Sequence, residues 1–209
     1  MTDQPSQPAV DPALAARVKG IILQPRAEWE RIDGEFATTQ TLFTRYAMIL
    51  AAIGPVCSLL GGQLLPIFGM RMPITAALVV AVVSYLLSLL GVFLLGLIIN
   101  ALAPSFGSVP SKIQAMKVAV YSWTAAWLAG VFGLVPMLGV LAILGLYSFY
   151  LLFVGLPILM RTPEDKKVGY FIVTLILSIV VYFIISAVIG SISMMFVAST
   201  AAMSGLAGL

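Results

Sequence analysis

The chain has 209 residues, of which 61% are apolar and 9% are charged, and its formal net charge at pH 7 is +3. A water-soluble domain of this size carries about 25% charged residues, so most of this chain must be surrounded by lipid. The low net charge and the lack of a basic stripe argue against nucleic acid as a partner. The sequence has no His and a single Cys, Cys57, so we expect no metal site, no disulfide and no cofactor.

The N-terminal region is predicted to lie outside the membrane. Residues 1–12 contain three Pro and few apolar side chains, which indicates a disordered tail. Residues 13–41 are predicted to form short amphipathic helices on the cytoplasmic side, one of which begins at Pro25 and has Trp29 and Ile32 three residues apart. Such helices either lie flat in the lipid headgroup layer or pack on the membrane bundle as a small cap, and the pattern leaves both alternatives open.

Residues 42–198 are predicted to form an integral membrane bundle of five transmembrane helices, so the expected fold class is all-α. Each apolar segment is close to the ~20 residues that a helix needs to cross the hydrocarbon layer. The spans are predicted at about 44–67, 73–100, 114–135, 137–160 and 164–197, followed by a non-cytoplasmic C-terminal end at 199–209.

Local signals mark three points in these spans. Gly54-Pro55 predicts a kink in the first span. Ser111 and Gln114 have the spacing of a capping box before the third span. The Thr-Pro-Glu-Asp sequence at 162–165 is predicted to cap the fifth span and to place two acidic residues at the positive end of its helix.

The distribution of Lys and Arg predicts the orientation of the chain. If the N-terminus is cytoplasmic, ten of the 11 Lys and Arg side chains lie on the cytoplasmic side and only Arg71 lies outside. Positive charge is concentrated in the cytoplasmic loops of membrane proteins. The sequence therefore predicts that the N-terminus is inside and the C-terminus outside.

Small side chains recur along one face of the second predicted span, at Ala77, Ala81, Ser84, Ser88 and Gly91. Helices in lipid associate through close packing of such residues, so packing within the chain is the favoured interpretation. A homodimer interface and a substrate groove lined by small side chains are the alternatives.

The predicted spans have no Asp, Glu, Lys or Arg deep in the membrane, which removes the groups that acid–base catalysis and ion coupling need. We therefore expect no catalytic residue and no enzymatic activity. A polar cluster inside the membrane is a candidate ligand site, although hydrogen bonds between helices are the favoured interpretation. Its members are Asn100, Tyr147, Ser148 and Tyr150.

Several stretches match one family in their order and spacing. They are VKGIILQPRAEWERI at 18–32, YAMILAAIGPVCSLLG at 46–61, SFGSVPSKIQAMKVAVYSW at 105–123 and LYSFYLLFVGLPILMRTPEDKKVGYFIV at 146–173. Together they resemble bacterial members of the Yip1 family of membrane proteins. The resemblance implies a five-span bundle with a cytoplasmic N-terminus.

Eukaryotic relatives in that family act in early secretory traffic and associate with small GTPases of the Rab type. The short tail of this chain lacks their acidic Asp-Leu-Tyr-Gly-Pro motif, which indicates a multi-pass protein of the bacterial inner (cytoplasmic) membrane. For that branch the resemblance implies a fold and no established biochemical activity.

The leading hypothesis is a non-enzymatic membrane adaptor or organiser in membrane trafficking or homeostasis. Its expected docking surface is cytoplasmic and comprises Trp29, Arg161, Lys166 and Lys167, which together make a basic, partly apolar patch suited to anionic lipid. Expected partners are membrane lipids, a second copy of the chain or other membrane proteins. The alternative is a transporter, channel or lipid-translocating protein for a neutral or lipid-like substrate, with a cavity bounded by Asn100, Tyr147 and Tyr150.

Overall fold

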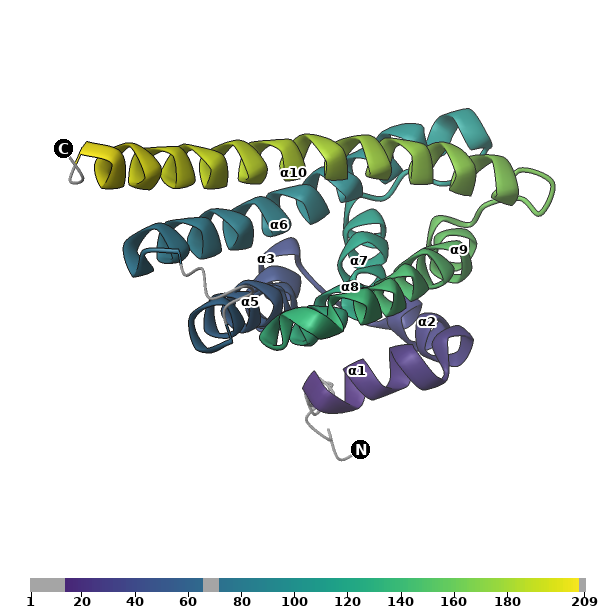
Figure 1. Ribbon diagram of the computed structural model, residues 1–209. Helices are drawn as coiled ribbons and strands as arrows, with labels where there is room; N and C mark the ends of the chain where they lie inside the picture. Colours follow the sequence, from purple (N-terminus) through teal and green to yellow (C-terminus); the bar gives the residue numbers. More distant parts are fainter. Residues whose placement is uncertain (1–13, 66–71, 207–209) are drawn as a thin grey trace.

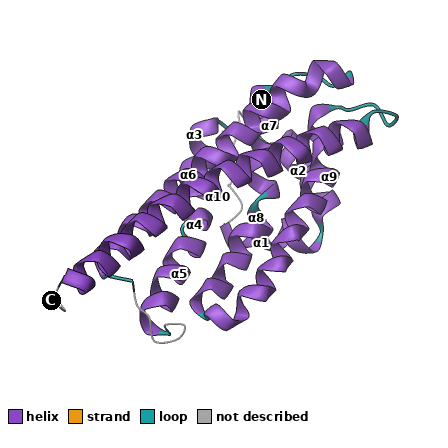
Figure 2. Cartoon of the chain, turned by 45° about the horizontal axis from the view of Figure 1, so that its top comes forward, coloured by secondary structure: helices purple, strands orange, loops and turns teal. Residues whose placement is uncertain are grey.

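The structure is a computed structural model that describes residues 14–65 and 72–206 of the chain. All regular structure in these two ranges is helical, which confirms the all-α class (Figure 1, Figure 2). The predicted tail at 1–12, Arg71 and the last residues of the C-terminal end lie outside the described residues.

Four helical stretches among the described residues are long and apolar enough to cross a membrane. They are Thr39–Leu64, Ile74–Phe106, Met137–Met160 and Lys167–Phe196. They correspond to the first, second, fourth and fifth predicted spans. The long helix α10 (Lys167–Leu206) runs beside α6 (Ile74–Leu102), and its first part also contacts α9 (Tyr147–Met160) (Figure 1).

The third predicted span, 114–135, is helical but broken. Its pieces are α7 (Lys112–Ser122), α8 (Thr124–Ala129) and the 3-10 helix η4 (Gly130–Leu134). At Trp123 the backbone ψ is −3°, far from the roughly −42° of a regular α-helix. The Thr124 hydroxyl donates to the Tyr121 carbonyl at 2.7 Å, a local bond that competes with continuation of the helix. None of the pieces is long enough to span a membrane alone, so a fifth crossing stays a prediction.

The first predicted span is also built from consecutive helical pieces. They are α3 (Thr39–Leu42), a π-helical turn (Phe43–Ala47), α4 (Met48–Ala51) and α5 (Ile53–Leu64). Pro55 has no amide hydrogen to donate to the carbonyl of Ala51, and the helix is interrupted at Ala52 between them. The predicted kink is therefore confirmed, one turn before the proline itself.

The predicted capping box before α7 is wrong. The Ser111 side chain makes no capping hydrogen bond. The Gln114 side chain, its predicted partner, instead donates to Oδ1 of Asp33 at 3.1 Å. A contact between distant parts of the chain has replaced the local one.

The fifth predicted span begins at Lys167 rather than at residue 164. The preceding helix α9 ends at Met160, and the next residue, Arg161, has a left-handed backbone (φ 53°). The Lys166 amide then donates to the Pro163 carbonyl at 3.0 Å, which closes a turn. The Thr162 hydroxyl does not cap the helix, because it is buried and accepts a hydrogen bond from the Ser108 hydroxyl at 2.9 Å. The turn after α9 is therefore bonded to Ser108, in the connection that follows α6, and does not form the first turn of α10.

The helix α5 and the 3-10 helix η4 approach each other through glycines. Gly61 is buried, and a Cβ atom placed on it would overlap the backbone carbonyl oxygens of Gly133 and Leu134. One residue further, a Cβ on Gly62 would meet nothing within 4 Å. Substitutions at these two neighbouring positions can therefore separate the effect of the close backbone contact at Gly61 from the general cost of a glycine in a helix.

We expect Gly61→Ala to lower the free energy of unfolding by about 1–3 kcal/mol, because the added methyl group forces two backbones apart. The matched variant Gly62→Ala should be neutral or stabilising, since alanine favours the helix and the site is open. Thermal unfolding of the purified variants in detergent measures both. Equal stability of the two variants would contradict the close approach.

Candidate functional site

The two N-terminal helices, α1 (Leu14–Leu23) and α2 (Pro25–Gly34), pack on the bundle and form what we call the N-terminal cap. Trp29 of α2 is completely buried, its ring meets Tyr121 edge to face with centroids 6.2 Å apart, and it lies against Gly155 of α9. A side chain at residue 155 would overlap the indole. The apolar face of α2 therefore packs on the bundle, as one of the two alternatives expected, while the position of the helix relative to the headgroup layer stays a prediction.

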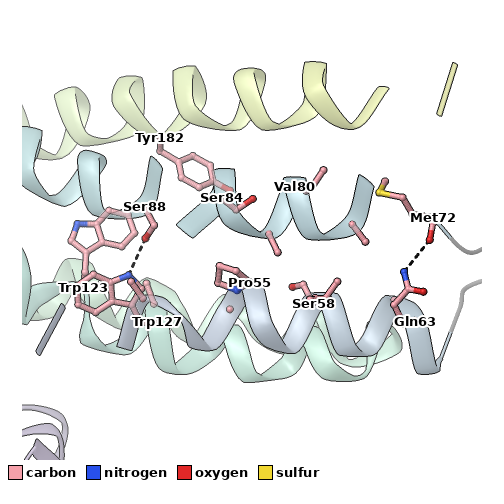
Figure 3. A pocket seen from close by; sticks show the side chains of 17 residues that line it. Pro55, Ser58, Gln63, Met72, Val80, Ser84, Ser88, Trp123, Trp127 and Tyr182 are labelled. Carbon is pink, nitrogen blue, oxygen red and sulfur yellow. Dashed lines mark hydrogen bonds between the residues drawn. The ribbon is translucent and has the colours of Figure 1, made fainter. Parts of the chain in front are cut away.

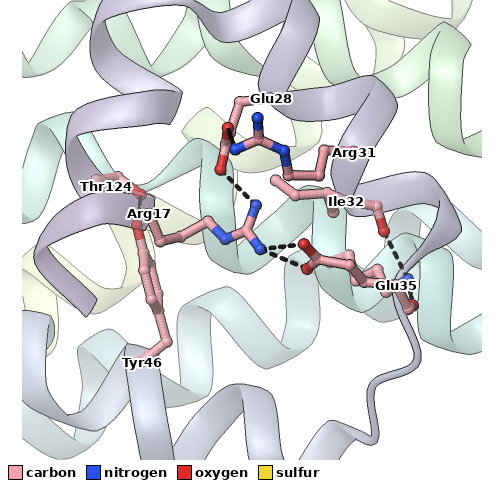
Figure 4. Close-up of polar contacts among 8 residues, drawn as sticks. Arg17, Glu28, Arg31, Ile32, Glu35, Tyr46 and Thr124 are labelled. Carbon is pink, nitrogen blue, oxygen red and sulfur yellow. Dashed lines mark hydrogen bonds and ion pairs between the residues drawn. The ribbon is translucent and has the colours of Figure 1, made fainter. Parts of the chain in front are cut away.

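A buried ion network joins the parts of the cap (Figure 4). The Arg17 guanidinium is 3% exposed and donates to Glu28 at 2.5 Å and to both carboxylate oxygens of Glu35 at 2.5 Å. Glu28 also accepts from the more exposed Arg31 at 2.9 Å. The guanidinium carbon of Arg17 lies 5.6 Å from the centre of the Tyr121 ring. A buried charge of this kind is tolerated only when it is paired and hydrogen-bonded, as it is here.

The protonation of Arg17 follows from the same contacts. Burial alone would lower the pKa of Arg17, but the hydrogen bonds that it donates to Glu35 and the charges of Glu35 and Glu28 outweigh burial and raise the pKa above its ordinary value. The guanidinium therefore stays charged.

A second set of polar contacts attaches the end of α2 to the bundle. The Lys117 ammonium of α7 donates to the carbonyls of Ile32 at 2.9 Å and Glu35 at 2.6 Å. Both acceptors lie at the C-terminal end of α2. Asp33 accepts from Arg161, just after α9, at 2.6 Å. The cap is thus bonded to two separate elements of the bundle.

The predicted docking surface is only partly assembled. Arg161, Lys166 and Lys167 lie together on the turn at 161–167, which the fold exposes, although Arg161 pairs with Asp33 and Lys167 with Glu164. Trp29 does not join them, because its indole is used for packing. The exposed aromatic residue of this region is Phe36, which is 93% exposed and follows Asp33 by three residues. Phe36 stands just after the end of α2, and this position outside the apolar face of the helix could have predicted its exposure.

The predicted polar cluster inside the membrane is not a single site. Tyr147 and Tyr150 are neighbours with ring centroids 5.2 Å apart, but the Tyr147 hydroxyl donates to the Ile22 carbonyl of the cap at 3.0 Å. Ser148 accepts from the Ala126 amide at 2.9 Å. Asn100 lies on α6, and no hydrogen bond or ring contact among the described residues links it to the tyrosines. The Tyr147 and Ser148 hydroxyls connect helices to each other.

A groove of about 900 Å³ lies between α5, α6 and α8, and we call it the α5–α6 groove (Figure 3). In Figure 3 Gln63 and Met72 stand at one end of it, Trp123, Trp127 and Ser88 stand at the other, and Ser58 and Ser84 lie between. The described residues that line it include no carboxylate, amine or guanidinium. Their mostly apolar side chains make a surface suited to an apolar ligand.

Small residues of α6 form one wall of this groove. Ala77, Ala81, Ser84 and Ser88 all line it, whereas Gly91 packs on Ile185 of α10. Two smaller hollows of about 460 and 280 Å³ share Trp123 and Tyr182 with it. Most of the small-residue face of the second span therefore faces a groove, which was one of the alternatives to packing within the chain. The residues predicted to bound a cavity, Asn100, Tyr147 and Tyr150, do not line this groove.

Comparison with known proteins places these features in a family. The family model of the Yip1 domain matches residues 19–187. The chain is 27% identical over 175 residues to inner membrane protein YohC of Escherichia coli K12, covering 79% of this chain and 90% of that protein, and it matches YohC of Escherichia coli O6:H1 equally. No solved structure matches.

Removal of the buried cation tests the ion network. We expect Arg17→Ala to destabilise the fold by about 3–5 kcal/mol, because Glu28 and Glu35 would lose their shared buried partner. Arg26→Ala should change little, since Arg26 is 85% exposed and its ion pair with Glu30 spans 3.7 Å. Thermal unfolding and limited proteolysis of the cap in detergent measure the difference, and an Arg17 variant as stable as the Arg26 variant would refute the role of the network.

Proposed function

The chain belongs to the Yip1 family and is a multi-pass inner-membrane protein, and we propose that it is a five-span, non-enzymatic adaptor or organiser whose N-terminus is cytoplasmic. The observation behind the adaptor role is the attachment of the N-terminal cap. Buried ion pairs join the parts of the cap, and the Lys117 contacts and the Asp33–Arg161 pair hold it against α7 and the end of α9, beside the basic turn at 161–167. A surface preorganised in this way costs little conformational entropy when a partner binds.

Contacts between the connections support the five-span topology. The Val109 amide donates to the Met160 carbonyl at 2.9 Å, and Asp33 pairs with Arg161, so the cap, the end of α6 and the end of α9 meet at one end of the bundle. α6 and α9 therefore both end on the same side. The broken segment 112–134 lies between them and must bring the chain back across the membrane for this to occur.

Cysteine labelling tests the topology. In a Cys57→Ser background, the exposed positions Val109 and Met137 are changed separately to Cys. With five spans and a cytoplasmic N-terminus, a membrane-impermeant maleimide should label Met137→Cys in intact spheroplasts and Val109→Cys only after lysis. Labelling of both from the same side would reject a crossing by segment 112–134. Phe36→Cys is the reference for the cytoplasmic side.

Charge reversal tests the docking surface. We expect Lys166→Glu combined with Lys167→Glu to leave membrane insertion intact and to weaken association with anionic lipid by at least about 2 kcal/mol, roughly 30-fold, at ~1 kcal/mol per basic residue. Co-purified anionic lipid and crosslinking to membrane partners are the measurements.

The matched control for this experiment is Lys19→Glu with Arg26→Glu, which makes the same charge change at exposed positions of the cap. Retained association in the control assigns binding to the 161–167 turn. Unchanged association in the Lys166/Lys167 variant argues against the docking surface, and equal losses in both variants indicate general attraction to charge.

A second candidate function is transport of a neutral or lipid-like substrate, and the α5–α6 groove is the observation that favours it. The groove is large enough for a ligand, and the described residues of its lining are uncharged. If reconstituted vesicles show no protein-dependent movement of lipids or neutral solutes, transport is rejected and the adaptor role is the remaining candidate.

A further inference from the structure

The α5–α6 groove has the length of one lipid chain in one leaflet. Its lining on the first span runs from Ala51 to Gln63, which is about 18 Å at ~1.5 Å per helical residue. The hydrocarbon core of a bilayer is ~30 Å thick, so the groove covers a little more than half of it. Its volume of about 900 Å³ lies within the ~300–1,000 Å³ range of ligand sites.

The polarity of the groove changes along this length (Figure 3). At the end of α5, the Gln63 side chain donates to the Met72 carbonyl at 3.0 Å, so this mouth is polar. At the opposite end, the indole N–H of Trp127 donates to the Ser88 hydroxyl at 3.1 Å. The Trp127 and Ser88 groups satisfy each other, and between the two ends the described lining is mostly apolar apart from the Ser58 and Ser84 hydroxyls. A molecule with a polar head at the Gln63 end and an apolar tail along the groove fits this lining.

Neither water nor an empty space fills such a groove well. The described lining is mostly apolar, and the Ser58 and Ser84 hydroxyls are the polar groups between its two ends, so water along the groove would find few hydrogen-bond partners. An empty groove would forfeit dispersion contacts along its walls. Lipid chains are available, because the lining residues Ser58 and Tyr182 are exposed at the surface of the bundle.

We propose that the α5–α6 groove is a binding site for one acyl chain of a phospholipid, which enters at Gln63 and ends against Trp123 and Trp127. In the proposed orientation, this lipid belongs to the non-cytoplasmic leaflet. The site depends on the membrane location of the protein and is independent of the cytoplasmic adaptor role. A resident chain also does not require transport, so chain binding without flux is consistent with this site.

The Trp residues provide the reporter. Trp127 is 6% exposed and is therefore shielded from the lipid that surrounds the bundle, but it lines the groove. Bromine atoms on a lipid chain quench tryptophan fluorescence on contact. Full-length protein is reconstituted in vesicles of phosphatidylcholine brominated either deep in the chain or near the headgroup. We expect the deep label to quench Trp127 more strongly than the shallow label.

Filling the groove tests occupancy. Ala81→Phe places a ring on the groove wall and should reduce quenching by the deep label at least twofold. Val82→Phe adds the same ring at a position 56% exposed to lipid and should leave quenching unchanged. Trp123→Phe combined with Trp127→Phe, which removes both reporters in the groove, should abolish the component that Ala81→Phe suppresses.

Thermal unfolding confirms that each variant is folded, and Ala77→Phe, one turn nearer the Gln63 mouth, replaces Ala81→Phe if that variant does not fold. Equal quenching in the Ala81 and Val82 variants would overturn the proposal. So would quenching of Trp127 by water-soluble acrylamide in place of the brominated chain, because that result would show a groove filled with water.

Discussion

The break in the helix at Trp123 is the feature on which the rest of the structure depends. Before the break, α7 presents Lys117 and Tyr121 to the N-terminal cap. After it, α8 presents Trp127 to the α5–α6 groove. The Thr124 hydroxyl bonded to the Tyr121 carbonyl, and itself paired with the Tyr46 hydroxyl at 2.8 Å, shows that this break is stabilised by the surrounding bundle.

The two halves of the molecule use opposite kinds of interaction. The cap is held together by the buried Arg17 ion pairs and is bonded to the bundle through Lys117 and the Asp33–Arg161 pair. The membrane half relies on close backbone approach, as at Gly61, and leaves a groove where small side chains of α6 face α5. The proposed docking surface and the proposed lipid site therefore involve different parts of one fold.

Much of the fold could be predicted because its signals are local. Long apolar segments predicted spans at about 44–67, 73–100, 137–160 and 164–197, and the structure has long apolar helical stretches at 39–64, 74–106, 137–160 and 167–196. Gly54-Pro55 marked the region in which the first of them is interrupted. The sites were harder to predict. Trp29 looked like a membrane anchor because an amphipathic pattern does not say what its apolar face contacts, and here that face meets Gly155 and Tyr121. Gln114 and Thr162 had the spacing of local caps, but partners more than fifty residues away in sequence took their hydrogen bonds.

The sequence by itself determined the class of the protein. Hydropathy over about twenty residues and the absence of charge are properties of a segment alone, and they sufficed to establish a helical membrane protein without acid–base groups in its interior. Only the tertiary structure decided which small residues of α6 pack and which line the groove, because that depends on the direction of α8 after the break at Trp123. It also decided that Arg17 is buried, since a guanidinium can leave water only where Glu28 and Glu35, distant in sequence, are brought to it.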